Sequence, residues 1–332
     1  MKILTLTLYF SLSALTSLAF AHSKATSSAF QEFAAEMERK HGFDRKELAT
    51  LLNQTQFRDD IIKAITRPAE AKPWYQYRPI FLKPDRIQGG LKFWQENESL
   101  LQKIANEYGV PPEIIVAIIG VETRYGQHIG RYRILDSLTT LAFGYPKRSS
   151  FFRSELEQFL LLTREEKVNP SQALGSYAGA MGKPQFISSS YRSYAVDYDG
   201  DGHRDLWNNN ADVIASVANY FKRHGWRPGE PITMEVKGGS NLDKFVNAGM
   251  KPSIKVADLF ANGVKPKGSA TADPSALASL IELDAGGHNE YWLGLHNFYV
   301  ITRYNHSNLY AMAAYQLSQE ILAAKRAAEK IN

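Results

Sequence analysis

Apolar residues recur every three or four positions over much of this chain, and that spacing predicts amphipathic helices. Helices are predicted over residues 29–40, 91–108, 150–164 and 308–330. A further helix is predicted over residues 209–224, with Asn209 as its N-terminal cap. The pattern therefore predicts a mainly α protein with some β structure.

Two regions depart from the helical spacing. Residues 72–79 combine two prolines with three aromatic side chains, so we expect this connector to be extended or turned. Its aromatic residues suit core packing or a platform for a sugar ring, and core packing is the more common role. After residue 228 the pattern alternates, with short strands predicted at residues 232–236, 291–293 and 297–302.

Residues 111–126 form the most informative predicted helix. A proline pair suits its first turn, and Gly126 can end it. Ile115 and Ile118 recur at helical spacing, and Glu122 continues the same apolar face. A carboxylate placed there either pairs with a cation or has its pKa raised and stays protonated. A protonated carboxyl group in an apolar wall can act as a glycosidase general acid, whereas Arg124 offers a simple salt bridge instead.

Composition narrows the function classes. The 332 residues are 44% hydrophobic and 22% charged, which is typical of a globular protein of two or three domains. The formal charge of +5 is not gathered in Lys/Arg runs, so we expect no nucleic-acid partner. The chain has no cysteine, which excludes disulfides, thiolate catalysis, Cys-ligated zinc and a lipid-modified N-terminal cysteine.

The first 21 residues have the pattern of a signal peptide. Met1-Lys2 is a short basic start, an almost wholly apolar or hydroxylic run follows, and Ala19-Phe20-Ala21 offers a cleavage site. We expect export to the periplasm with cleavage near Ala21. The alternative is an uncleaved membrane anchor, because the apolar run is nearly long enough to span a bilayer.

A calcium-binding loop is the most specific local signal. In Asp197-Tyr-Asp-Gly-Asp-Gly-His203, side-chain oxygens stand at positions 1, 3 and 5, a turn glycine at 6, and a carbonyl ligand at 7. The bidentate acid expected at position 12 is replaced by Asn208, and Asp212 is the acid that can close a longer loop. The alternative is an Asp/Gly-rich turn held by its own side-chain hydrogen bonds.

No second catalytic acid is identified by spacing. Asp136, Glu155 and Asp197 are present, but nothing in the sequence ties one of them to a cleft shared with Glu122. The histidines show no metalloprotease spacing, and neither a phosphate-binding glycine loop nor a serine nucleophile elbow is present.

Five blocks in one order resemble the lytic murein transglycosylase B family. They are Val121-Glu-Thr-Arg-Tyr-Gly126, Ser176-Tyr-Ala-Gly-Ala-Met-Gly182 with Gln185-Phe186, the 197–203 loop, Val217-Ala-Asn-Tyr-Phe221 and Ile301-Thr-Arg-Tyr-Asn305. The resemblance implies a lysozyme-like helical core with a helical N-terminal domain and a small β-containing insertion. We therefore expect a signal peptide (1–21), a helical N-terminal domain (22–95), a catalytic core with the calcium loop (96–228), a β-containing insertion (229–302) and a helical C-terminal segment that completes the core (303–332).

The same resemblance implies roles for individual residues. Glu122 corresponds to the single catalytic acid/base of the family. The implied glycan groove is lined by Tyr77, Ser176, Gln185, Tyr304, Asn305 and Tyr310, which reverses the packing interpretation for Tyr77. The implied ligands of a structural calcium ion are Asp197, Asp199, Asp201, His203 and Asp212. Two departures stand out: Lys183-Pro184 replaces an aromatic residue and a glycine, and the calcium loop is one residue longer.

The implied reaction is cleavage of the β-1,4 bond between MurNAc and GlcNAc in peptidoglycan, without water, to give 1,6-anhydroMurNAc ends. No organic cofactor is expected. The expected partners are peptidoglycan glycan strands and cell-wall synthesis proteins, and we expect a monomer. Two alternatives remain open: a hydrolytic muramidase on the same fold, and a non-catalytic, calcium-stabilised glycan-binding module.

Overall fold

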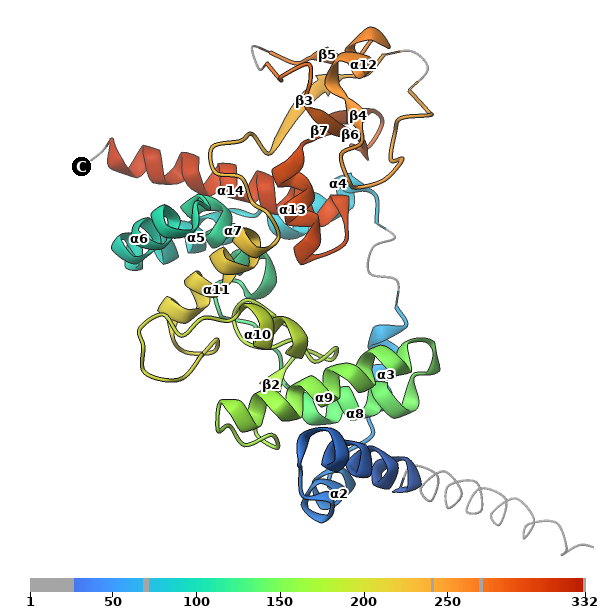
Figure 1. Cartoon of the computed structure of the whole chain (residues 1–332). Coiled ribbons are helices and arrows are strands. Elements are labelled where there is room, and N and C mark those ends of the chain that lie inside the picture. The colour runs from blue at the N-terminus through green and yellow to red at the C-terminus, as the bar shows by residue number, and fades with distance from the viewer. Residues whose placement is uncertain (1–26, 68–71, 240–241, 269–270, 331–332) are drawn as a thin grey trace, which may run out of the picture. The chain divides into compact units, whose positions relative to one another are not determined.

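The computed structural model describes residues 27–67, 72–239, 242–268 and 271–330 (Figure 1). The predicted signal peptide and its cleavage site lie outside these residues. The chain forms two compact units, each built from segments distant in sequence. Unit 1 contains the described residues up to Arg67 together with Arg131–Ala180, and unit 2 contains the other described residues. The five segments expected from the sequence stay a prediction.

Unit 1 is helical. A helix over residues 27–41 is followed by α2 (Arg45–Asn53), α3 (Asp59–Ile65), α8 (Ile134–Gly144), the short 3-10 helix η1 (Pro146–Arg148) and α9 (Ser149–Glu165). Two short strands, β1 (Tyr132–Arg133) and β2 (Leu174–Gly175), pair antiparallel. Most of α8 is buried, and aromatic rings of the first helix pack against it, with the rings of Phe30 and Phe143 5.0 Å apart.

Unit 2 is organised around α7 (Pro112–Thr123). Nine of its twelve residues are buried, so α7 is enclosed on nearly all sides instead of burying the single face predicted from its spacing. The surrounding helices α5 (Pro84–Glu96) and α14 (Asn308–Glu329) pack against it, and α4 (Trp74–Phe81) packs against α14. The remaining helices of the bundle are α6 (Glu98–Tyr108), α10 (Ser188–Tyr194), α11 (Asn210–Arg223) and α13 (His296–Tyr304).

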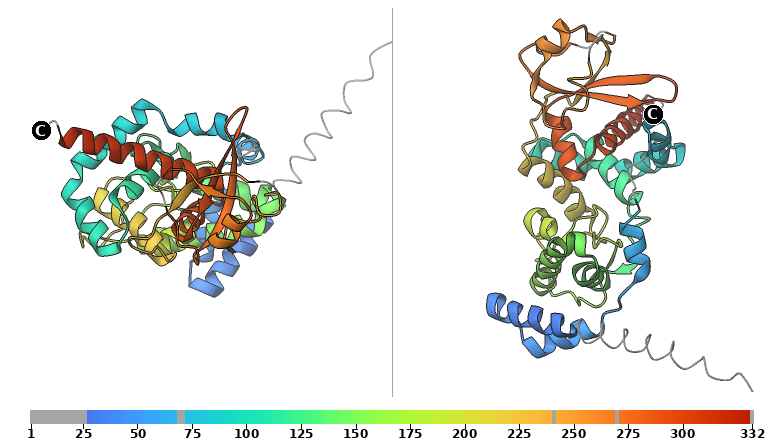
Figure 2. Two further views of the ribbon diagram at one scale, coloured as in Figure 1. Left: turned by 90° about the horizontal axis from the view of Figure 1, so that it is seen from above. Right: turned by 90° about the vertical axis from the view of Figure 1, so that its right-hand side faces the viewer.

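A five-stranded antiparallel sheet completes unit 2 and leads directly into α13 (Figure 2). Its order is β4 (Ile254–Lys255), β6 (Leu277–Asp284), β7 (Asn289–Gly294), β3 (Thr233–Lys237) and β5 (Lys265–Pro266). The helix α12 (Val256–Ala261) follows β4. Its apolar side chains form a separate core with those of the sheet, including Leu259, Leu280 and Leu293.

Most of the predicted helices are confirmed, and two predictions are wrong. The connector at residues 72–79 is helical: Pro73 stands at the N-cap of α4, where a missing N–H costs no helical hydrogen bond, and Pro79 lies inside the helix. Residues 297–302 belong to α13 and not to a strand; a short apolar run does not distinguish a buried helix from a strand. The helix predicted over residues 91–108 is divided at Asn97.

No single helix among the described residues is long and apolar enough to cross a membrane. The consecutive helices α6 and α7 together have the length and apolar composition of a membrane-spanning segment, but they are bent by 111° relative to each other.

Candidate active site

Glu122 lies in the last turn of α7 with its side chain partly exposed between buried neighbours. Its Oε1 accepts a hydrogen bond from the Tyr310 hydroxyl at 2.5 Å. No Lys, Arg or His side chain of the described residues forms an ion pair with it. Arg124, the cation considered from the sequence, lies instead 4.0 Å from Asp85. The salt-bridge interpretation of Glu122 therefore has no support in the described part of the chain.

The protein environment shifts the protonation equilibrium of Glu122. Burial raises the pKa of this carboxyl group from 4.5 to about 7, because it removes water that would stabilise the charge. The hydrogen bond donated by Tyr310 acts in the opposite direction. Near neutral pH, both protonation states of Glu122 are therefore populated, as a residue that alternates between acid and base requires.

Aromatic residues surround this carboxyl group. The rings of Tyr304 and Tyr310 are nearly parallel, with an angle of 8° and 6.5 Å between their centres. The Tyr304 hydroxyl donates to the Pro184 carbonyl at 2.6 Å. Burial and the charge of Glu122 raise the pKa of both phenols well above 10, so both remain neutral hydrogen-bond donors. Tyr77 is 9% exposed and lies among the rings of α4, within electrostatic reach of Tyr310.

The other predicted groove residues, Gln185, Asn305 and Ser176, lie in different surroundings. Gln185 has a positive φ of 53°, and its amide donates to the carbonyls of Gly182 and Ile129 at 2.9 and 3.2 Å. Asn305 is exposed directly after α13. Ser176 belongs to unit 1, where its hydroxyl accepts hydrogen bonds from the backbone of the 178–180 turn.

Arg86, which sequence reasoning missed, supports the end of α7 that carries Glu122. This arginine is only 7% exposed, and its guanidinium donates to the carbonyls of Gly120 and Val121 at 2.7 and 3.3 Å. It also lies over the ring of Phe81, 5.2 Å from the ring centre. A cation at this position offsets the negative end of the helix dipole beside the carboxyl group. Its place on α5, directly after Asp85, gave no sequence signal of a contact with α7.

Tyr125 fixes the turn that follows α7. Its backbone is left-handed, with φ of 61°, and its hydroxyl donates to the Arg86 carbonyl at 2.8 Å. The ring fits against glycines of α5 and α7, and a Cβ added at Gly120 would lie 2.5 Å from the phenol oxygen. Thr123 holds the same turn, since its hydroxyl donates to the Lys183 carbonyl at 2.8 Å and accepts from the Gly126 backbone.

The Lys183-Pro184 departure lies beside this turn. The Lys183 side chain packs over Gly126, where an added Cβ would come within 2.9 Å of it. Its ammonium group donates to the side chain of Asn210, at the start of α11, at 2.5 Å. This departure therefore places a long aliphatic side chain against the end of the turn and connects it to α11.

The predicted calcium loop brings three acids together. Carboxylate oxygens of Asp197, Asp199 and Asp212 lie within 4.8 Å of one another. Asn209 links this loop to the helix, because its side chain caps α11 and also donates to Asp199 at 2.7 Å. Burial raises the pKa of Asp212, and the two neighbouring carboxylates raise it further. Three crowded carboxylates form a donor set of the kind that suits a hard divalent cation.

Two of the predicted calcium ligands, Asp201 and His203, lie outside this three-acid group. Both are exposed, and Asp201 accepts a hydrogen bond from the His203 backbone at 2.8 Å. Asp212 joins the group although it is distant in sequence, because α11 directs its first turn at the loop. Both Asp212 oxygens also accept backbone hydrogen bonds, from Tyr198 and Asp205, each at 2.8 Å.

The other candidate acids have local partners. Asp136, in unit 1, pairs with Arg133 at 2.6 Å and accepts a hydrogen bond from the Gln56 backbone. Asp197 accepts backbone hydrogen bonds within its own loop.

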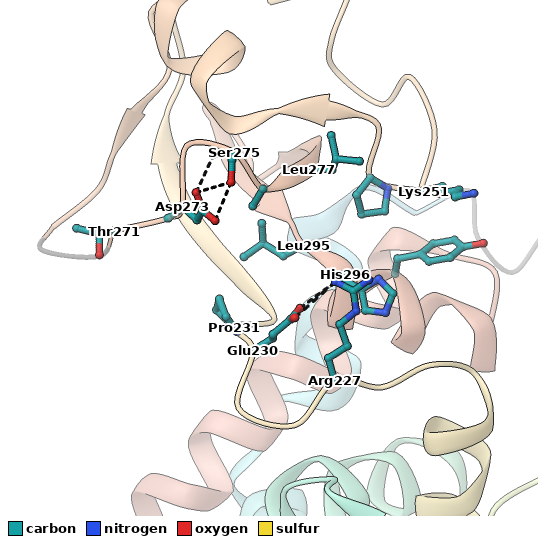
Figure 3. A pocket seen from close by; sticks show the side chains of 14 residues that line it. Arg227, Glu230, Pro231, Lys251, Thr271, Asp273, Ser275, Leu277, Leu295 and His296 are labelled. Atoms are coloured by element: carbon teal, nitrogen blue, oxygen red, sulfur yellow. Dashed lines mark hydrogen bonds and ion pairs between the residues drawn. The ribbon is translucent and has the colours of Figure 1, made fainter.

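A cavity of about 780 Å³ lies between the sheet and the start of α13, near the Arg227–Glu230 ion pair (Figure 3). None of the predicted site residues lines that cavity.

Comparisons with known proteins show which family this chain resembles. Residues 25–319 match the model of the transglycosylase SLT domain. The chain is 45% identical over 305 residues to the membrane-bound lytic murein transglycosylase B of Escherichia coli K12, with 89% of this chain and 83% of that protein covered.

Two solved structures share the fold. The soluble lytic transglycosylase SltB1 from Pseudomonas aeruginosa is 46% identical with a TM-score of 0.85, over 90% of this chain and 99% of that one. The E. coli lytic transglycosylase Slt35 in complex with calcium is 46% identical with a TM-score of 0.82, over 89% and 93%. The predicted mainly α, lysozyme-like fold is thereby confirmed, and the chain belongs to the transglycosylase SLT family.

Proposed function

We propose that this enzyme, a lytic murein transglycosylase, cleaves the MurNAc–GlcNAc β-1,4 bond of peptidoglycan without water and forms 1,6-anhydroMurNAc ends. Membership of the transglycosylase SLT family supports the reaction class. The observation that carries the chemistry is Glu122: a partly exposed side chain whose carboxyl group has lost much of its hydration, has no cation partner among the described residues and has a pKa of about 7.

In the first step, protonated Glu122 donates its proton to the glycosidic oxygen as the C1–O bond breaks. The bonding electrons leave with that oxygen, and GlcNAc departs with a hydroxyl group. The carbonyl oxygen of the substrate's own N-acetyl group meets the positive charge at C1, so no second protein carboxylate is needed. The Tyr310 hydroxyl, 2.5 Å from Oε1, then stabilises the newly formed carboxylate of Glu122.

In the second step, the Glu122 carboxylate takes the proton of the C6 hydroxyl. The C6 oxygen attacks C1, the bond to the acetamido oxygen breaks, and the 1,6-anhydro ring closes. Glu122 is again protonated, so one residue serves both half-reactions. Its pKa of about 7 suits this exchange, since neither protonation state is strongly favoured near neutral pH.

For the glycan groove, we propose Tyr77, Ser176, Gln185, Tyr304, Asn305 and Tyr310. The chemistry of two of them supports direct contact with sugar. The side-chain oxygen of Gln185 and the amide of Asn305 have no hydrogen-bond partner among the described residues. The hydroxyls of Tyr304 and Tyr310 are already used by Pro184 and Glu122, and Tyr310 is only 3% exposed.

We further propose a structural calcium ion in the loop of residues 197–212. Asp197, Asp199 and Asp212 would hold it, with Asp201 and the His203 carbonyl as further ligands. Bound calcium supplies charge neutralisation, and the role of the loop residues is to join residues 197–203 to the start of α11. The calcium complex of the E. coli relative supports this assignment.

For the location of the enzyme, we propose the periplasm. The N-terminal pattern of a basic start, an apolar run and Ala19-Phe20-Ala21 supports export, and peptidoglycan is the matching substrate. As further partners we propose cell-wall synthesis proteins, and we propose a monomer.

The proposed reaction is tested by the chemical form of the released ends. Purified sacculi are digested with the wild-type protein, and the mass of the soluble muropeptides is measured. Anhydro ends, which lack one water relative to reducing ends, support the transglycosylase reaction. Reducing ends would identify a hydrolytic muramidase, and binding without release would identify a glycan-binding module.

A further inference from the structure

The turn that follows Glu122 has a strained backbone. Three consecutive residues, Arg124, Tyr125 and Gly126, are left-handed, with φ of 49°, 61° and 92°. Glycine adopts this conformation readily, whereas residues with a side chain do so at a cost. A strained backbone persists only where the surrounding structure holds it in place. The orientation of Glu122 therefore depends on the contacts that fix this turn.

Lys183 contacts the turn with both its backbone and its side chain. Its carbonyl accepts a hydrogen bond from the Thr123 hydroxyl at 2.8 Å, and its aliphatic chain packs over Gly126. Its own backbone N–H donates to the Leu206 carbonyl at 2.8 Å. Because Pro184 follows, the backbone of Lys183 is also restricted in conformation. Lys183 therefore lies fixed between the turn and the segment that leads into α11.

The ammonium group of Lys183 extends this connection to two more helices. It donates to the side chain of Asn210, the first residue of α11, at 2.5 Å. The Asn210 amide donates in turn to the side chain of Asn97, at the junction of α5 and α6, at 3.1 Å. Burial lowers the pKa of Lys183, so the charge is kept here at a cost. Packing over Gly126 needs only the aliphatic chain, and the ammonium group therefore serves the contact with α11.

We propose that Lys183 is a positioning residue, which holds the strained turn against the start of α11 and so keeps the Glu122 carboxyl group oriented for proton transfer. The inference rests on the proposed function and adds to it a residue that acts through the turn. A lysine in this role is a feature of this chain, since Lys183 stands where the family resemblance places an aromatic residue. A small displacement of a catalytic group slows the chemical step, so loss of Lys183 should reduce kcat and leave KM unchanged.

The experiment compares two substitutions of Lys183. Lys183→Met keeps an unbranched apolar chain over Gly126 and removes the donor to Asn210, whereas Lys183→Arg keeps a donor. Cleavage of soluble peptidoglycan strands is measured as all new chain ends, anhydro and reducing together. We expect Lys183→Met to lower kcat about tenfold with KM unchanged, and Lys183→Arg to retain most of the wild-type kcat.

Hydrogen exchange measures the turn itself, independently of activity. The backbone N–H groups of Arg124 and Tyr125 donate to carbonyls of α7, so their exchange reports whether the turn is held. We expect faster exchange at residues 124–126 in Lys183→Met and unchanged exchange in the rest of α7. The matched control is Lys222→Met, which removes an ammonium group of α11 that donates to the Glu107 carbonyl at 3.3 Å. This control should change neither kcat nor the exchange of the turn.

Four results would each overturn the proposal: an unchanged kcat in Lys183→Met, a rise in KM in place of a fall in kcat, a loss that Lys183→Arg shares in full, or the same loss in the control. Reducing ends alone, or no release, from the wild type would refute the proposed function instead. The exchange of residues 124–126 would then decide by itself whether Lys183 holds the turn.

Discussion

Replacing Glu122 by Gln should change how protein stability depends on pH. The carboxyl group has a pKa of about 7 in the folded protein and 4.5 as its ordinary value. That difference corresponds to about 3 kcal/mol, since one pKa unit is worth about 1.4 kcal/mol. Between pH 4.5 and 7, the folded protein holds this proton more tightly than the unfolded chain. The free energy of unfolding of the wild type therefore falls as pH rises through that window.

Glutamine does not titrate, so the free energy of unfolding of the variant does not fall in this way as pH rises. We expect the stability of Glu122→Gln relative to wild type to rise by about 3 kcal/mol between pH 4 and pH 8. Urea unfolding of both proteins across this range, followed by tryptophan fluorescence, measures the difference directly. Glu96→Gln, an exposed site on α5, serves as the control and should show no comparable trend.

A stability difference that does not vary with pH would refute the claim that the protein dehydrates Glu122. A difference that falls with rising pH would indicate a cation partner, because a paired carboxylate has a lowered pKa and stabilises the folded state at higher pH.

Three further predictions concern the surroundings of this carboxyl group. Tyr310→Phe removes a hydrogen bond that lowers the pKa of Glu122, so the alkaline limb of the kcat/KM profile should move to higher pH; an unchanged limb would contradict this role. Arg86→Met should reduce stability by about 2 kcal/mol, because it leaves the Gly120 carbonyl without its charged donor; a thermal melt measures the loss, and an unchanged Tm would contradict this support. Removing calcium with a chelator should lower Tm, and Asp199→Asn should abolish that response; a chelator effect that persists in the variant would place the metal elsewhere.

Sequence reasoning found the elements whose physical signal is local. The helix with Glu122 follows from its proline start and apolar spacing, and the three-acid loop follows from its Asp and Gly pattern. The prediction of a strand at residues 297–302 was wrong, because buried apolar runs have the same pattern in helices and strands. The prediction of an extended connector at residues 72–79 was wrong, because a proline at a helix start is compatible with the helix that follows.

What the sequence did not indicate depends on contacts between distant segments. Arg86 supports α7 from 34 residues away, and Tyr310 approaches Glu122 from 188 residues away. The resemblance to a family pointed to Tyr310, but only the structure shows its hydroxyl on the carboxyl oxygen. Likewise, the raised pKa of Glu122 is a property of the walls around it, which no local pattern contains.

The most direct test of the central claim is the mass of the ends released from purified sacculi by wild-type and Glu122→Gln proteins. We predict anhydro ends from the wild type and a loss of release in the variant, which cannot donate the proton and then take it back. Undiminished release by Glu122→Gln would contradict the assignment of Glu122 as the acid and base. Reducing ends from the wild type would contradict the reaction without water.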